Sequence, residues 1–144
     1  MLNSVTYQSY AQVYDLAGQG RYGELMARWS LAWLAQRGDS PQRVLDLACG
    51  TGAASLVFAS AGCVVSGVDA ALPMLEIARA KARDARLSAT FICADMRYLA
   101  ADNRQHDAVT CFTDGINYAS SEGDLERVFD GAAAALRPGG WLIF

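Results

Sequence analysis

The chain has 144 residues, which is enough for one domain with one substantial hydrophobic core. Apolar residues make up 53% of it and charged residues 19%, and this balance excludes an intrinsically disordered chain. The net charge of -3, without any run of lysine or arginine, argues against a general binder of nucleic acid or of anionic membranes.

The four cysteines do not have the spacing of a metal site or of a disulfide framework. No two of them stand in a CxxC pair, and the chain has one histidine, His106, which opens a predicted strand. No signal peptide opens the sequence, and no apolar run approaches the length of a membrane span. We therefore expect a cytoplasmic protein with reduced thiols, no metal and no membrane contact.

The first predicted element is a helix over residues 22–36, where Met26, Trp29 and Trp33 share one face. It belongs to a helical N-terminal lead, residues 1–40, that precedes a core of residues 41–144. We expect the whole chain, residues 1–144, to form one domain.

Five short apolar runs follow, and each predicts a strand that is buried on both faces because hydrophobic residues hardly alternate with polar ones. The runs cover residues 43–47, 63–68, 90–93, 107–112 and 140–144. Two helical patterns lie between them, one with Pro73 in its first turn and one that Ser121 caps and Pro138 to Gly140 end. Strands that alternate with helices predict an α/β fold with a parallel sheet. We expect a Rossmann-like doubly wound sheet, for which we take the strand order 3-2-1-4-5.

Polar residues follow directly after the predicted strands, at the edge where such sheets bind their ligands. A glycine-rich turn with Asp46 at its mouth follows the first strand and Asp69 the second. Asp95 follows the third strand, and Thr113 and Asp114 follow the fourth. These residues should meet around one site.

The glycine turn, "LDLACGTGAAS", does not suit phosphates. No lysine follows Gly50 or Gly52, which excludes a P-loop, and Ser55 stands where a dinucleotide fingerprint has its third glycine. The carboxylate of Asp46 would repel a pyrophosphate but attract an amino group. The turn therefore favours a nucleoside that carries an amino acid, although Asp46 could also act only as a cap for the turn and helix.

The segment "VLDLACGTG" resembles motif I of the class I S-adenosylmethionine-dependent methyltransferases. "GVDAALPMLEIARAKA", "CADM" and "DAVTCFTDGINYA" are similar to the family's later segments, in the same order, and the resemblance runs from "YQSYAQVYD" to "LRPGGWLIF". It implies an enzyme that transfers a methyl group from S-adenosylmethionine to a nitrogen or oxygen of a small-molecule acceptor. The N-terminal tyrosines and "DGINYA" look most like the branch that acts on small molecules, including sugar N-methyltransferases. Two alternatives are an NAD(P)-binding Rossmann oxidoreductase and a non-catalytic cofactor-binding or scaffold domain.

The resemblance also implies the roles of individual residues. Asp46 would hold the methionine amino group, directly or through water, Asp69 would accept from both ribose hydroxyls, and Asp95 from the adenine amino group. Asp69 follows Gly50 at about the twenty-residue spacing of a ribose-binding acid, although it could also cap the helix that follows. The cofactor-binding residues implied are Asp46, Ala48, Gly50, Gly52, Asp69, Ala70, Asp95, Met96 and Phe112.

The sequence departs from the family pattern at two positions, with Ala48 where a glycine is usual and Ala71 where the family often has serine or threonine. Nothing in the sequence singles out a catalytic residue. The residues expected near the acceptor are Tyr14, Tyr22, Asp114, Asn117 and Tyr118.

The final run, "GGWLIF", carries neither a charge nor a proline after Gly140 that would protect an open sheet edge. In the family that the chain resembles, two further strands follow and cover this edge. We therefore expect a methyltransferase that is incomplete at its C-terminus and that self-associates through residues 140–144.

Overall fold

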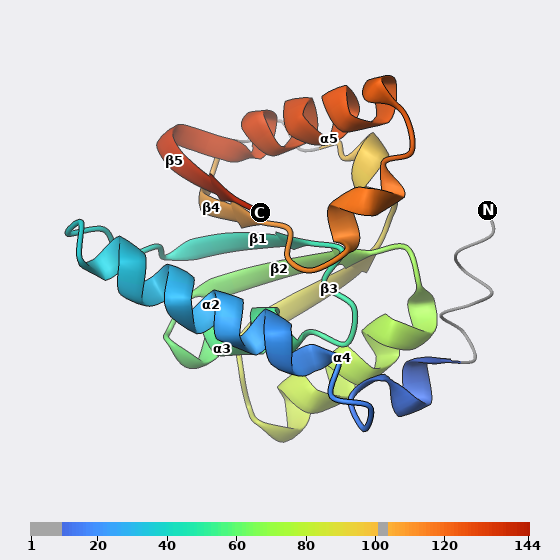
Figure 1. Cartoon of the computed structure of the whole chain (residues 1–144). Coiled ribbons are helices and arrows are strands. Elements are labelled where there is room, and N and C mark those ends of the chain that lie inside the picture. The colour runs from blue at the N-terminus through green and yellow to red at the C-terminus, as the bar shows by residue number, and fades with distance from the viewer. Residues whose placement is uncertain (1–9, 101–103) are drawn as a thin grey trace.

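The structure, a computed structural model, describes residues 10–100 and 104–144. A parallel sheet of order β3-β2-β1-β4-β5 forms its centre (Figure 1), as the alternation of strands and helices predicts. The strands are β1 (Arg43–Leu47), β2 (Val64–Asp69), β3 (Ala89–Cys93), β4 (His106–Thr110) and β5 (Leu136–Ile143).

Helices cover both faces of this sheet. In Figure 1, α2, α3 and α4 lie below the sheet and α5 lies above it. Successive strand residues point to opposite faces of the sheet. Val44 therefore packs in the core between the sheet and helices α2 and α3, whereas Leu45 packs in the core between the sheet and α5. The helices are α2 (Gly20–Ala35), α3 (Ala53–Ser60), α4 (Leu72–Asp84) and α5 (Glu122–Ala135), with the short 3₁₀ helices η1 (Met96–Tyr98) and η2 (Gly115–Tyr118).

The local signals at the helix starts are confirmed. Pro73 stands in the first turn of α4, where its fixed φ suits a helix and its missing N–H is not needed. The Ser121 hydroxyl accepts a hydrogen bond from the backbone N–H of Asp124 at 3.1 Å and so caps α5. Residues 10–14, ahead of α2, are also helical.

The expectation that every strand is buried on both faces is wrong for β3 and β5, the two outer strands of the described sheet. In β3, Thr90, Ile92 and Cys93 are exposed, and in β5 no residue is fully buried. Composition alone does not distinguish an edge strand from a central one, because the same apolar residues occur in both.

The expected end of the last helix is also wrong. The sequence predicts a helix that continues to Pro138, but α5 ends at Ala135, and Leu136 is extended (φ -76°, ψ 137°) and begins β5. Its pairing with β4 jumps from His106–Leu136 to Ala108–Trp141, so Arg137 to Gly140 form an irregular bulge. Pro138 disfavours the α conformation for the residue before it, which explains why the helix does not reach the glycines.

Candidate functional site

A cleft of about 1150 Å³ opens at the carboxyl edge of the sheet. A small cavity of about 40 Å³ lies beside it, under the glycine turn, and Asp46 and Phe112 line this cavity. The predicted residues that line the cleft are Tyr14, Tyr22, Ala48, Gly50, Asp69, Ala70, Asp95, Met96, Asp114, Asn117 and Tyr118. The order of the strands thus brings together residues that are more than a hundred positions apart.

The glycine turn holds the left-handed backbone that its sequence requires, but its two glycines differ in their surroundings. Gly50 has φ +54°, and a Cβ placed there would meet no atom within 4 Å, so its backbone faces open space along the cleft. Gly52 has φ +77°, and a Cβ there would come within 3.0 Å of the Ala78 Cβ and 3.1 Å of the Phe91 ring. Gly52 lines neither cavity, and it allows the turn to pack closely against α4 and β3.

Ala48, where the resemblance expects a glycine, also has a left-handed backbone, with φ +52°. For a residue with a Cβ this conformation costs about 1–2 kcal/mol. The Ala48 Cβ is accommodated because Gly115 faces it, and a Cβ on Gly115 would lie only 2.6 Å away. The turn after β1 and the start of η2 therefore fit together as a small-residue pair.

The Asp46 carboxylate is buried at the end of β1, with 1% of the residue exposed. Its oxygens accept hydrogen bonds from the Ser55 hydroxyl at 2.6 Å and the Thr110 hydroxyl at 2.8 Å. Burial raises the pKa of this carboxyl to about 6, although both hydrogen bonds lower it. Ser55, which replaces the third glycine of a dinucleotide fingerprint, therefore serves as a partner of Asp46.

The Asp69 carboxylate, at the end of β2, holds the glycine turn and the start of α4 together. It accepts from the backbone N–H of Gly50 at 2.8 Å and from that of Ala71 at 2.8 Å. Burial raises the pKa of Asp69, and these two hydrogen bonds oppose the shift. Because each oxygen accepts one protein hydrogen bond, each keeps a further lone pair for a ligand.

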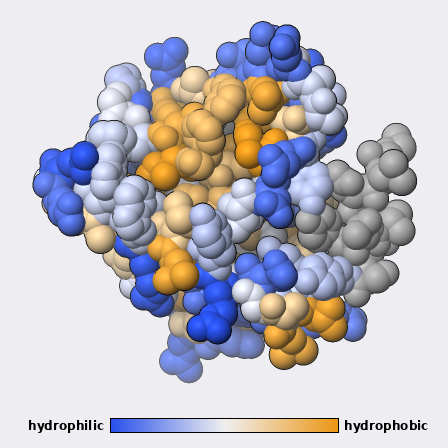
Figure 2. Space-filling model, in the orientation of Figure 1, coloured by the Kyte–Doolittle hydropathy of each residue, from blue (hydrophilic) through white to orange (hydrophobic). Residues whose placement is uncertain are grey.

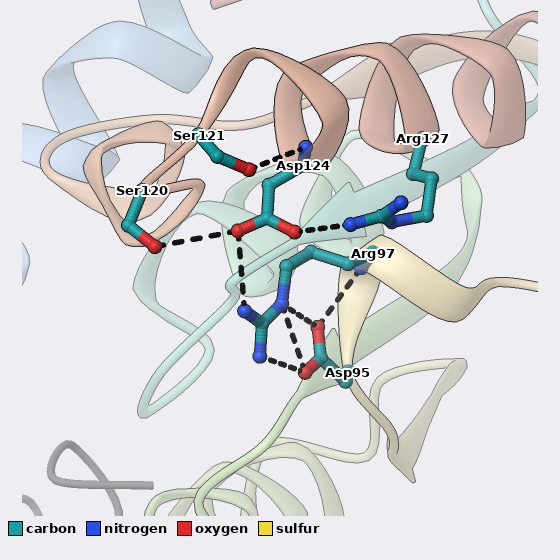
Figure 3. A network of polar contacts seen from close by, with 6 residues as sticks. All are labelled: Asp95, Arg97, Ser120, Ser121, Asp124 and Arg127. Carbon is teal, nitrogen blue, oxygen red and sulfur yellow. Dashed lines mark hydrogen bonds and ion pairs between the residues drawn. The ribbon is translucent and has the colours of Figure 1, made fainter.

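The Asp95 carboxylate has a cationic partner, in contrast to Asp46 and Asp69. The Arg97 guanidinium donates to both of its oxygens, through Nη2 at 2.5 Å and Nε at 3.0 and 3.1 Å (Figure 3). These hydrogen bonds lower the pKa of Asp95 below its ordinary value. Arg97 also lines the cleft but was not predicted, and its position two residues after Asp95 is the one signal in the sequence.

The N-terminal lead forms one wall of the cleft. Tyr10 and Tyr14 line the cleft in edge-to-face contact, with ring centroids 5.7 Å apart. Asp15 ties this wall to the glycine turn, since it accepts from the Thr51 hydroxyl at 2.7 Å and pairs with Lys81 of α4 at 2.8 Å. The described part of the tyrosine-rich stretch begins at Tyr10, so the start of that stretch lies outside the described residues.

The segment after β4 forms the opposite wall. Asp114 directly precedes η2, Asn117 and Tyr118 lie within it, and Ser120 follows it. Sequence reasoning missed several lining residues, namely Gln19, Met74, Ala94, Arg97 and Ser120. Met74 and Ala94 lie within segments that resemble the family and Arg97 stands two residues after Asp95, but nothing in the sequence alone indicates that these side chains face the cleft.

The charges of the cleft indicate what it can bind. Among the described residues that line the small cavity or the cleft, four are aspartates, at positions 46, 69, 95 and 114, whereas one is an arginine, Arg97, and its guanidinium is paired. Such a site favours a cationic or neutral polar ligand over a phosphate. Within residues 10–100 and 104–144 no group of acidic, histidine and cysteine side chains is arranged to hold a metal ion. The same residues contain no helix long and apolar enough to cross a membrane.

The model of the family described as "Methyltransferase domain" matches residues 44–140. YqeM of Bacillus subtilis (strain 168), named provisionally as a methyltransferase, is 35% identical to this chain over 139 residues. The matched segment covers 96% of this chain and 54% of YqeM. A ubiquinone biosynthesis O-methyltransferase of Coxiella burnetii is 31% identical over 103 residues, 72% of this chain and 42% of that protein. The chain thus spans about half the length of the curated relatives it matches.

Solved structures show the same similarity. An S-adenosylmethionine-dependent methyltransferase from Clostridium acetobutylicum superposes with a TM-score of 0.80 at 27% identity, over 96% of this chain and 56% of that one. CalS10, an amino pentose methyltransferase from Micromonospora echinaspora solved with S-adenosylmethionine bound, gives a TM-score of 0.76 at 30% identity, over 91% and 55%. KedS8, a sugar N-methyltransferase from Streptoalloteichus, gives 0.76 at 30% identity, over 91% and 52%.

Proposed function

Because the chain belongs to the class I S-adenosylmethionine-dependent methyltransferases, we propose that its cleft binds S-adenosylmethionine and serves methyl transfer to a nitrogen or oxygen of a small-molecule acceptor. One observation carries the proposal. The uncharged glycine turn lies between two largely desolvated carboxylates, Asp46 and Asp69, which suits an ammonium group and a ribose but not a pyrophosphate.

Asp69 is the proposed ribose acid. Its two oxygens already fix the turn through Gly50 and the start of α4 through Ala71, so the carboxylate is held in one orientation. The lone pairs that remain can accept from the two ribose hydroxyls as charge-assisted hydrogen bonds. Ala70 and Met96 line the cleft next to this position and next to Asp95, and Asp95 is the proposed partner of the adenine amino group.

Asp46 is the proposed counter-charge for the methionine amino group. Its oxygens are engaged by Ser55 and Thr110, and it reaches the ligand side only through the small cavity beside the turn. That cavity has room for about one water molecule, and a bridging water would carry the contact without moving the carboxylate. We propose Phe112 as a wall here, Ala48 and Gly50 as the backbone along the methionine part, and Gly52 as the residue that lets the turn pack.

When bound, S-adenosylmethionine supplies a methyl group on a positively charged sulfur. The residues of this chain then have to bring the acceptor into line, and such positioning can supply about 7–11 kcal/mol of a barrier. An amine that binds neutral needs no base, whereas a hydroxyl gains from one. Asp114, Tyr14 and Tyr118 are the proposed acceptor-side candidates, together with Tyr22 and Asn117.

The acceptor class rests on the relatives. CalS10 is named as an amino pentose methyltransferase and KedS8 as a sugar N-methyltransferase. The Coxiella relative is named as an O-methyltransferase. We therefore propose a small molecule with a nucleophilic nitrogen or oxygen. Nucleic acid stays an unfavoured partner, because the cleft is lined by carboxylates.

A ligand panel tests the proposal. S-adenosylhomocysteine, NAD and NADP are each added to the chain at 100 times the dissociation constant found for S-adenosylhomocysteine, and thermal unfolding is followed. Linkage predicts a stabilisation of about 2.7 kcal/mol by S-adenosylhomocysteine and none by the dinucleotides. A shift with NAD but not with S-adenosylhomocysteine overturns the proposal in favour of an oxidoreductase. If S-adenosylhomocysteine binds but no acceptor is methylated, the chain acts as a cofactor-binding domain.

We also propose that copies of this chain associate through the outer edge of β5. Within the described residues β5 pairs with β4 alone, and Phe144, which directly follows it, is exposed. Figure 2 shows apolar side chains gathered over β5 and the adjoining part of α5. Open edges and apolar patches of this kind favour association. Sedimentation velocity should show assemblies that a Phe144→Lys variant disperses, whereas a wild-type monomer at all concentrations contradicts this.

A further inference from the structure

Arg97 lies between the residue proposed to recognise adenine and the N-terminus of α5. Its backbone N–H and its Nε both donate to Asp95 Oδ1, at 2.9 and 3.0 Å. Its Nη2 donates to Asp95 Oδ2 at 2.5 Å, with a longer contact from Nε at 3.1 Å. One residue therefore holds the carboxylate of Asp95 through both oxygens and from its own main chain (Figure 3).

The number of acceptor sites on the Asp95 carboxylate limits how many further donors it can bind. An ionised carboxylate has about four lone-pair sites, two on each oxygen. Arg97 brings three N–H groups to these sites, because its single Nε–H is shared almost equally between Oδ1 at 3.0 Å and Oδ2 at 3.1 Å. About one acceptor site of the carboxylate is therefore left for a further donor, and the adenine amino group of a ligand in the cleft is such a donor.

The other side of the guanidinium is held as well. Arg97 Nη1 donates to Asp124 Oδ2 at 3.4 Å, and Asp124 is fixed by Arg127 at 2.6 Å and by the Ser120 hydroxyl at 3.3 Å. The cap that Ser121 gives to Asp124 completes the network in Figure 3. Two carboxylates on opposite sides thus prevent the Arg97 fork from turning away from Asp95.

We propose that Arg97 is a positioning residue that sets adenine specificity. It holds the Asp95 carboxylate so that the one acceptor site left open faces the cleft, and the ligand must supply an amino group there. The inference rests on the proposed function, because it needs S-adenosylmethionine in the cleft. It goes beyond that function in assigning to Arg97 the choice between adenine and a purine that lacks the amino group.

A merely structural role for Arg97 predicts something different. The ion pairs link η1 to α5, and they are about one third exposed on the Arg97 and Asp95 side chains, so their effect on stability is small. If Arg97 only joins these elements, its loss changes the free energy of unfolding or the affinity for every ligand alike. If it positions Asp95, its loss changes the ratio of two affinities.

The experiment measures that ratio by calorimetry on the full chain. The two probes are S-adenosylhomocysteine and its 6-deamino analogue, in which a hydrogen replaces the adenine amino group. The wild type should prefer S-adenosylhomocysteine by about tenfold or more, as a hydrogen bond to a charged group predicts. Arg97→Gln should reduce this preference to about twofold or less, mainly by weakening S-adenosylhomocysteine binding.

Arg127→Gln is the matched control. This variant removes the guanidinium that donates to Asp124 at 2.6 Å, and Arg127 makes no contact with Asp95 in the network of Figure 3. The wild-type preference should persist in this variant. Arg97→Lys supplies the second comparison, because it keeps the positive charge but lacks the planar fork that holds two oxygens. It should fold as the wild type does and still lose most of the preference.

The possible results distinguish a failure of the proposed function from a failure of the role proposed for Arg97. If the wild type does not bind S-adenosylhomocysteine, the proposed function fails and the role of Arg97 fails with it. If the wild type binds and prefers S-adenosylhomocysteine but Arg97→Gln or Arg97→Lys keeps the full preference, only the inference about Arg97 fails. Urea unfolding of each variant checks that the fold is intact, so that a lost preference cannot come from unfolded protein.

Discussion

The two ends of the cleft use the same residue type in opposite ways. At the turn end, Asp46 is buried and Asp69 is half-buried beside the glycine turn, and both accept hydrogen bonds from neutral groups. At the arginine end, Asp95 is more exposed than Asp46 and forms a bidentate hydrogen-bonded ion pair with Arg97. Burial raises the pKa of the first two carboxyls, whereas the guanidinium lowers that of the third.

This difference tells what each end can recognise. A carboxylate that is desolvated without a cation is held at a cost in free energy, and a ligand cation that reaches it offsets part of this cost. A carboxylate that an arginine already neutralises has little net charge to offer, so it selects by the direction of its remaining lone pair. We therefore propose that Asp46 at the turn end favours a ligand cation, whereas Asp95 at the arginine end favours a donor that meets its remaining acceptor site.

The largest expected effect comes from removing the charge at the turn end. The pKa of Asp46 in the folded chain is about 6, above its ordinary value of 3.8. The native state therefore binds the proton more tightly, so stability is highest below pH 4 with respect to this group and falls as the pH rises to 6. At pH 7 the ionised form costs about 3 kcal/mol. Asp46→Asn should recover much of this, because the Ser55 and Thr110 hydroxyls can donate or accept.

Urea unfolding between pH 4 and pH 8 measures this prediction. The variant should be more stable than the wild type at pH 7, should lose the decline between pH 4 and pH 6, and should bind S-adenosylhomocysteine more weakly. Asp107→Asn is a control in which the change in stability should have the opposite sign. Burial raises the pKa of Asp107, but hydrogen bonds from Arg137 and from the N–H groups of Gln42 and Arg43 lower it below its ordinary value. A destabilised Asp46→Asn variant at pH 7 contradicts the account.

A smaller effect, on binding, is expected from Asp69→Asn. The amide keeps the size of the side chain, but one of its two ends can no longer accept from a backbone N–H or a ribose hydroxyl. The affinity for S-adenosylhomocysteine should fall by about 2 kcal/mol, the amount typical of a hydrogen bond to a charged group. Asp69 also fixes Gly50 and Ala71, so some stability is lost as well.

The same two probes sharpen the comparison between the ends of the cleft. Asp69→Asn should weaken S-adenosylhomocysteine and its 6-deamino analogue equally, since both carry the ribose, whereas Arg97→Gln should change their ratio. Calorimetry on both variants measures this. If Asp69→Asn alters the preference, the two ends are coupled and do not act separately.

Much of this site could be predicted from the sequence, because the physical signals are local. Five apolar runs separated by helical patterns indicate a parallel sheet, and parallel strands place their carboxyl ends at one edge. Asp46 and Asp69 stand at the ends of their strands, and so their positions follow from the strands themselves.

The remainder depends on contacts between distant segments. Arg97 is recognisable only when α5 brings Asp124, 27 residues later, against it. Gly52 looks the same as Gly50 in the sequence, yet Phe91 and Ala78 determine that it serves packing. The start of β5 was placed wrongly because a proline and two glycines look like the end of a helix, whereas here they form a bulge in a strand.

The smallest expected effect concerns Asp15, a carboxylate that is neither buried nor chelated by arginine. It pairs with Lys81 at 2.8 Å while both side chains are about one third exposed, so the pair contributes about 0.5 kcal/mol at most to stability. Asp15→Asn should therefore leave the unfolding midpoint nearly unchanged. It should nevertheless raise hydrogen exchange in residues 10–19, because Asp15 is the residue that ties this wall to Thr51 of the glycine turn.

Lys81→Met removes the other partner and should raise exchange in the same residues, and the double variant should add little to either single change. Ala11, which packs against Ala71 and Met74, provides the competing explanation, since apolar contact alone could hold the wall. Unchanged exchange in both single variants, measured by mass spectrometry at low and at high salt, shows that this apolar contact suffices. Increased exchange that high salt reproduces in the wild type shows instead that the wall depends on a screened surface charge.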